Sequence, residues 1–223
     1  MIIAIDGPSG AGKSTVATAV ARRLGFHCLD TGAMYRSIAW KAIQQGADLA
    51  DEAAVGAIAQ TFDIAFEHEE GDPRPSRVLI GGDDVTAAIR TAEIDRSVSV
   101  VSAHPSVRAA LVEQQRRIAE GGDYVIEGRD IGTVVCPNAE VKVFLTATNE
   151  ARARRRVAQN AERGVGSVDF EEVLADIIRR DELDSSRATA PLVQADDAVL
   201  VDSSDKTIDE VIDAICAMAD ARA

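Results

Sequence analysis

The sequence predicts an α/β fold, a single domain built on a five-stranded, mostly parallel sheet with helices on both faces. Short apolar runs alternate along the chain with segments in which apolar residues recur at helical spacing, the pattern of strands joined by helical crossovers. The chain has 223 residues, 46% of them hydrophobic, which is enough for one sizeable core with insertions. In such folds the ligand site lies at the carboxyl ends of the strands.

Five apolar runs are the expected strands of this sheet: residues 2–5, 26–29, 124–126, 141–145 and 198–201. Helical spacing predicts helices over residues 13–24, 33–45, 52–60, 90–121 with a break at Pro105, 149–164, 169–185 and 208–215. Between residues 62 and 85 two short strand patterns, 62–66 and 78–80, flank a charged loop with Gly and Pro. We therefore expect a small antiparallel insert there.

The loop after the first strand reads Gly-Pro-Ser-Gly-Ala-Gly-Lys-Ser over residues 7–14, which fits the phosphate-binding pattern G-x-x-x-x-G-K-[ST]. Its glycines tolerate the backbone conformations that turn N–H groups inward around a polyphosphate. Lys13 would place its charge between the β- and γ-phosphates, and Ser14 would offer its hydroxyl to Mg²⁺. The predicted ATP-binding residues of this P-loop are Gly7, Pro8, Ser9, Gly10, Ala11, Gly12, Lys13, Ser14 and Thr15. A glycine-rich turn without a ligand is the alternative, and the complete match between a strand and a helix argues against it.

Composition excludes several classes of function. A formal charge of −13 argues against a general binder of nucleic acid or anionic membranes, which needs a net positive surface. Three widely spaced cysteines, Cys28, Cys136 and Cys216, fit neither a metal site nor a disulfide framework. No apolar run is long enough for a membrane span, and Met1 leads directly into a strand. We expect a soluble, cytoplasmic protein, and a monomer, because neither terminus shows a heptad pattern.

Arginines concentrate near the strand ends and in the helix after residue 145. Guanidinium groups bind phosphates through paired hydrogen bonds and stay charged when desolvated. An arginine-rich shell around a P-loop suits a reaction in which two phosphorylated molecules meet. For any one arginine, such as Arg154 or Arg179, pairing with a nearby acid on the same helix remains the alternative.

Four sequence blocks carry a family resemblance: residues 29–36 (LDTGAMYR), 84–91 (DVTAAIRT), 128–135 (GRDIGTVV) and 180–192 (RDELDSSRATAPL). In this order they resemble the bacterial cytidylate kinases, from Met1 to about Asp202. The resemblance implies a P-loop NTPase fold of the nucleoside monophosphate kinase type, and transfer of the γ-phosphoryl group of ATP to CMP or dCMP with Mg²⁺. It also implies a CORE (about 1–36, 89–151 and 180–223), a monophosphate-binding insert (about 37–88) and a mobile LID (about 152–179).

The resemblance also assigns roles to individual residues. Arg36, Arg129 and Arg187 match the arginines that hold the acceptor phosphate, Ser99 and Arg108 the groups that read cytosine, and Arg180 and Asp184 the contacts to the sugar. Thr31 would turn its hydroxyl toward base or phosphate, and Asp130 would orient Arg129. On the LID side, Arg152, Arg155 and Arg156 share one helical face, so at least two of them could reach the phosphates of ATP. The implied catalytic set is Lys13, Asp130, Arg156 and Arg187. At Glu127 some relatives have Asp, and its role stays open.

Rival functions lack their expected features. A GTP-dependent switch needs a guanine-reading N-K-x-D motif, which residues 146–150 after the fourth strand do not supply. Another small-molecule kinase on this fold, acting on shikimate, dephospho-coenzyme A or AMP, disagrees with the blocks at 29–36 and 128–135. A non-catalytic ATP-binding module would lack the acceptor-side arginines. No catalytic histidine is needed, because the attacking phosphate oxygen is already anionic.

Overall fold

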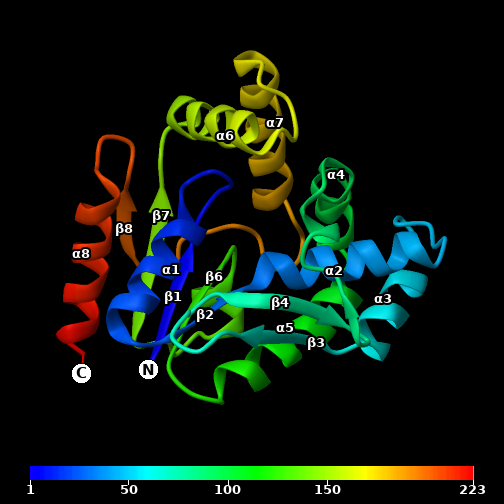
Figure 1. Ribbon diagram of the computed structural model, residues 1–223, viewed down its shortest axis with the longest axis horizontal. Helices are drawn as coiled ribbons and strands as arrows, with labels where there is room; N and C mark the ends of the chain where they lie inside the picture. Colours follow the sequence, from blue (N-terminus) through cyan, green and yellow to red (C-terminus); the bar gives the residue numbers. More distant parts are fainter. Residues whose placement is uncertain (223) are drawn as a thin grey trace.

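The computed structural model describes residues 1–222. Its centre is a sheet of five parallel strands in the order β2-β6-β1-β7-β8 (Figure 1). The strands are β1 (Ile2–Asp6), β2 (His27–Asp30), β6 (Tyr124–Gly128), β7 (Val141–Thr146) and β8 (Val199–Asp202). The predicted α/β class and all five predicted strands are confirmed.

Helices cover both faces of the sheet, which explains why its inner strands read as continuous apolar runs. Along β1, Ile3 and Ile5 belong to the core cluster that contains α1 (Lys13–Leu24) and α8 (Ile208–Asp220). Ala4 belongs to the cluster on the opposite face, with α2 (Thr31–Gln44) and α5 (Pro105–Ala119). Successive side chains of the strand therefore pack into the two cores on opposite faces of the sheet.

The insert holds a helix and a second, antiparallel sheet of three strands: α3 (Glu52–Thr61), β3 (Ile64–His68), β4 (Pro75–Ile80) and β5 (Asp83–Asp84). Its buried side chains, including Ile64, Val78 and Ile80, join the cluster that also contains α2 and α5. The antiparallel insert predicted from the sequence is confirmed, although β4 begins three residues earlier than expected.

Three elements were not predicted from the sequence: a 3₁₀ turn (Ala88–Arg90), the strand β5 and a π-helical turn (Ile131–Val135). The π-helical turn depends on a contact distant in sequence, because the Asp6 carboxylate accepts the backbone N–H groups of Ile131 and Gly132, both at 2.7 Å. Local periodicity carries no signal for such a bond.

Above the carboxyl edge of the sheet lie α6 (Asn149–Arg163) and α7 (Phe170–Ser185), packed against each other (Figure 1). Thr148 caps α6, and Gly164 ends it with a left-handed φ of 63°. Their buried residues form a small separate cluster of Ala153, Val173 and Ile177. The helix α4 (Ala92–Val101) lies between α2 and α7. Among residues 1–222, no helix combines the length and apolar character that crossing a bilayer requires.

Candidate active site

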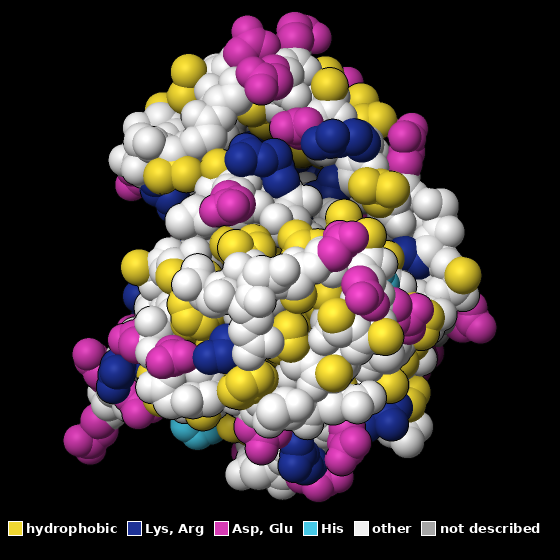
Figure 2. Space-filling view, turned by 90° about the vertical axis from the view of Figure 1, so that its right-hand side faces the viewer, with side chains coloured by type: hydrophobic (Ala, Val, Ile, Leu, Met, Phe, Trp, Pro, Cys, Tyr) yellow, Lys and Arg dark blue, Asp and Glu magenta, His cyan; other side chains and the backbone are white. Residues whose placement is uncertain are grey.

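A cavity of about 590 Å³ opens at the carboxyl ends of the strands, as predicted for this fold class. Seven arginines and two lysines line it, against four carboxylates. Lys and Arg side chains gather in the hollow beneath the α6–α7 pair (Figure 2). Because the whole chain carries a formal charge of −13, this basic lining is a local feature, and it suits a polyanionic ligand.

The P-loop forms one end of the cavity. Gly7, Gly10 and Gly12 all have positive φ, and a Cβ on Gly7 would lie 2.0 Å from the Leu145 carbonyl oxygen. The helix α1 starts at Lys13 after Gly12, which has no side chain to cap it. The N–H groups of its first turn thus stay available for an anion. Ser9 and the residues from Gly10 to Thr15 line the cavity, whereas the predicted ATP-binding residues Gly7 and Pro8 do not.

Lys13 is buried and donates to the Pro8 carbonyl at 2.8 Å. Burial, and next the charge of Arg129, hold the pKa of Lys13 well below its ordinary value. A phosphate beside it would supply the counter-charge that this buried ammonium group requires.

Arg129 and Arg187 are both held by one carboxylate. The Nε of Arg129 donates to Asp184 Oδ2 at 2.9 Å, and the other oxygen of Asp184 accepts from Arg187. Asp184 is 1% exposed, and the neighbouring charges of Arg129 and Arg187 outweigh its burial, so that its pKa lies below the ordinary value. Both arginines therefore enter the cavity in fixed positions. A contact from Asp184 to a ribose, as the resemblance implies, would share this carboxylate with them.

Asp130 does not orient Arg129, which corrects the expectation from the sequence. Its carboxylate pairs instead with Arg108, whose side chain is 4% exposed and also donates to the Ser102 carbonyl at 3.2 Å. A buried guanidinium requires a carboxylate partner, and Asp130 is the one that reaches it, while Arg129 turns toward α7. Arg108 lies 5.5 Å from the centre of the Tyr35 ring. Arg108, Asp130 and Tyr35 thus form a rigid polar corner of the cavity.

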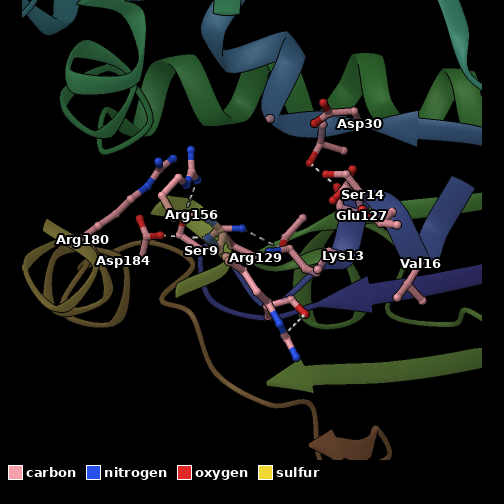
Figure 3. Close-up of a pocket in the computed structure, with 18 of the residues that line it drawn as sticks. Ser9, Lys13, Ser14, Val16, Asp30, Glu127, Arg129, Arg156, Arg180 and Asp184 are labelled. Atoms are coloured by element: carbon pink, nitrogen blue, oxygen red, sulfur yellow. Dashed lines mark hydrogen bonds and ion pairs between the residues drawn. The ribbon is translucent and has the colours of Figure 1, made fainter. Parts of the chain in front are cut away.

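Arg36 and Arg180 complete the cationic wall. The Nε of Arg180 is buried without a hydrogen-bond partner, and burial, with the charges of Arg129 and Arg36, lowers the pKa of Arg180 to about 9. Arg180, Arg156 and Asp184 all line the cavity (Figure 3). Cations crowded in this way are stabilised when an anion enters between them.

The three arginines of α6 that were predicted to bind ATP, Arg152, Arg155 and Arg156, separate into two groups. Arg155 and Arg156 line the cavity; Arg155 donates to Ser203 Oγ at 3.0 Å, and Arg156 to Ser9 Oγ at 3.3 Å. Arg152 lies behind the P-loop, 3% exposed, where it donates to the Ser9 carbonyl at 2.8 Å and pairs with Asp181. Two of the three side chains reach the cavity, and the third ties α6 to the back of the loop.

Oxygen atoms that could bind a divalent cation lie beside Lys13. Ser14, Asp30 and Glu127 gather at one end of the cavity (Figure 3). Burial, and next the Asp30 carboxylate, raise the pKa of Glu127 to about 7. Hydroxyl and carboxylate oxygens are the ligands that Mg²⁺ prefers. Within the described residues no group of three or more His, Cys, Asp or Glu could hold a metal ion.

The remaining predicted residues lie on the α2 and α4 sides. Thr31 lines the cavity, and its hydroxyl donates to the Glu127 carbonyl at 2.7 Å. Ser99 does not line the cavity; Val98 and Ser102 of the same segment do.

Sequence reasoning missed a wall formed beyond β8. Its residues are Ser203, Lys206, Thr207, Ile208 and Val211. They follow the carboxyl end of a predicted strand. Because ligand sites of such folds lie at this edge of the sheet, that position in the sequence could have indicated them. Asp30, Tyr35 and Gln159 also line the cavity and were not predicted as site residues.

A model of the family described as cytidylate kinase matches residues 3–221. The cytidylate kinase of Saccharophagus degradans is 48% identical over 222 residues, covering 100% of this chain and 98% of that protein. The cytidylate kinase of Rhodococcus opacus is 52% identical over 215 residues, covering 95% of this chain and 91% of that protein. An uncharacterized protein from Eubacterium ventriosum is similar in fold alone, with a TM-score of 0.54, 13% identity, and coverage of 100% and 99% of the two chains. The resemblance found in four motif blocks is confirmed, and the chain belongs to the cytidylate kinase family.

Proposed function

We propose that this chain transfers the γ-phosphoryl group of ATP to CMP or dCMP, releasing ADP and CDP or dCDP. One observation carries the proposal beyond family membership. A single cavity joins a P-loop to a second group of phosphate-binding candidates, Arg36, Arg129 and Arg187, so that it offers places for a donor and an acceptor phosphate.

On the donor side, the P-loop N–H groups and Lys13 would hold the polyphosphate. Arg155, Lys206 and Ile208 form the adjoining wall, which offers apolar and cationic surface for the adenosine part of ATP. Ser14 would hold Mg²⁺, with Asp30 and Glu127 close enough to orient its water ligands, and the ion would screen the charge of the transferring group.

On the acceptor side, Arg129 and Arg187 are already fixed by Asp184, so little ordering is left when a monophosphate binds. Arg108 and Asp130 offer a donor and an acceptor to the edge of a base. Arg180 would contact the sugar. No general base is required, because an anionic phosphate oxygen attacks.

The α6–α7 pair would close over both substrates and bring Arg156 to the transferring phosphoryl group. Closure would expel water that otherwise hydrolyses ATP. The separate small core of this pair supports movement as one body.

The three cysteines are unpaired, which supports a reducing compartment and thus a place in cytoplasmic pyrimidine nucleotide metabolism. We propose a monomer that works without nucleic acid, which analytical ultracentrifugation at several concentrations would test.

Acceptor profiling tests the proposed reaction. Purified protein with ATP and Mg²⁺ should release ADP rapidly when CMP or dCMP is present, and slowly with AMP or shikimate. EDTA should abolish the release. ATP binding without ADP release for any nucleoside monophosphate would contradict the proposal, and turnover of shikimate would favour a different small-molecule kinase.

A further inference from the structure

Asp95, in the first turn of α4, lies between two arginines of the cavity that come from different parts of the chain. Its Oδ1 accepts from Arg36 Nε at 3.3 Å, and its Oδ2 lies 4.0 Å from Arg156 Nη1. Arg36 belongs to α2 on the acceptor side, and Arg156 belongs to α6 in the predicted LID. One carboxylate therefore connects the two sides of the site.

Asp95 contacts these arginines from behind. Arg36 and Arg156 line the cavity, but Asp95 does not. The bond to Asp95 uses the Nε of Arg36, so the two terminal nitrogens of that guanidinium stay free for a phosphate. Arg156 faces Asp95 with Nη1 and donates from its other terminal nitrogen, Nη2, to Ser9 Oγ at 3.3 Å. The geometry orients both guanidinium groups without placing Asp95 where a substrate would bind.

Electrostatics give Asp95 a second effect on the same groups. Burial lowers the pKa of Arg156, and Asp95 is the largest charge that opposes this change. Burial also acts on Arg36, but the carboxylates of Asp30 and Asp95 raise its pKa above the ordinary value. With a side chain 35% exposed, Asp95 reaches these cations without the full cost of burying a charge.

We infer that Asp95 is a positioning residue for phosphoryl transfer, which aligns Arg36 for the acceptor phosphate and Arg156 for the transferring phosphoryl group. The inference rests on the proposed function, since it acts through the roles given to these two arginines. A carboxylate that instead competed with the acceptor phosphate for Arg36 would have the opposite effect on the affinity for CMP.

The test compares Asp95→Asn with a control of equal charge change, Glu93→Gln. Glu93 is exposed in the same helical turn, and its carboxylate has no ion pair within the described residues. Asp95→Asn should raise KM for CMP about fivefold and lower kcat about fivefold, the size of one charge-assisted contact in each case. Glu93→Gln should leave both within about twofold and Asp95→Glu should restore part of the loss, while the Tm of all three variants stays near that of the wild type.

Double-mutant cycles show whether Asp95 acts through the arginines. In an Arg36→Ala background, Asp95→Asn should no longer raise KM, and in an Arg156→Ala background it should no longer lower kcat. Additive effects, an unchanged KM and kcat, or a lower KM for CMP in Asp95→Asn would overturn the inference while the wild type remains an active kinase. A wild type that releases no ADP from ATP and CMP would overturn the proposed function itself, and with it the inference.

Discussion

The α6–α7 pair lines the cavity and the insert does not, and the two regions are attached to the rest of the molecule by different kinds of contact. The insert buries Ile64, Val78 and Ile80 in the cluster that also holds α2 and α5. The α6–α7 pair buries Ala153, Val173 and Ile177 only among its own residues. Its ties to the rest include polar contacts such as the bond from Arg152 to the Ser9 carbonyl.

This difference predicts which region moves. Separating a buried apolar surface costs about 25 cal/mol per Å², whereas a hydrogen bond from an arginine can be replaced by one to a phosphate or to water at little net cost. We therefore expect the α6–α7 pair to open and close as one body during turnover while the insert stays with the sheet.

The largest effect should come from matched isoleucine truncations in the two regions. Ile80, in the insert, is completely buried, and Ile177, in α7, is 5% exposed. Ile80→Ala should lower the free energy of unfolding of the whole protein by about 3 kcal/mol. Ile177→Ala should lower it by less, because it loosens the small cluster alone, and should mainly speed amide exchange in α6 and α7. Chemical denaturation measures the global loss, and hydrogen exchange measures the local effect in α6 and α7. An equal loss in the free energy of unfolding for both variants would contradict the inference that the α6–α7 pair packs separately from the main core.

The next effect concerns the catalytic face of α6. Arg156→Ala should lower kcat more than about tenfold, because one charged contact to the transferring phosphoryl group is lost. The control is Arg154→Ala on the exposed side of the same helix, which should leave kcat unchanged. A coupled assay with ATP and CMP measures kcat of both variants. Near-normal kcat of Arg156→Ala would contradict a contact between Arg156 and the transferring phosphoryl group.

A smaller effect should follow from glycine substitutions in one loop of each region. Gly166, between α6 and α7, has φ 86°, and an added Cβ would lie 2.8 Å from Asn160 Nδ2, which hydrogen-bonds to the Ser167 carbonyl. Gly71, in the insert, has φ 80° and no atom within 4 Å of such a Cβ. Both alanine variants carry a backbone cost of about 1 kcal/mol, and Gly166→Ala adds a steric clash. Local exchange should rise further around Gly166 than around Gly71; the reverse order would show that the loop between α6 and α7 tolerates the clash.

The smallest effect should be a pH dependence of the insert. Hydrogen bonds from the Thr86 hydroxyl and backbone, followed by one from Arg77, lower the pKa of Asp84 from 3.8 to about 2. Because this carboxyl titrates lower in the folded state, its contribution is complete above pH 3.8 and is lost as the pH falls through about 2. Carboxyl NMR titration should show this midpoint, and Asp84→Asn should remove the corresponding acid-induced loosening of β4 and β5. A midpoint near 3.8 would contradict the hydrogen bonding.

Local signals in the sequence predicted the strands, most helices, the P-loop and the arginine-rich edge, because periodicity and glycine spacing act within a few residues. Pairings across the chain had no such signal. Arg129 meets Asp184 across 55 positions, and Arg108 meets Asp130 across 22. Helical spacing placed Arg152 on the same face of the helix as Arg156. It did not show on which side of the P-loop Arg152 would lie. Asp95 sits in no motif, and only the fold brings it to Arg36.

Binding of one molecule that joins adenosine to cytidine through a bridging polyphosphate tests most directly whether donor and acceptor phosphates meet beneath the α6–α7 pair. The compound should compete with both ATP and CMP, bind at one site per chain, and slow hydrogen exchange more in α6 and α7 than in the insert. Competition with only one substrate, or equal protection of both regions, would contradict a shared cavity closed by a separately packed helix pair.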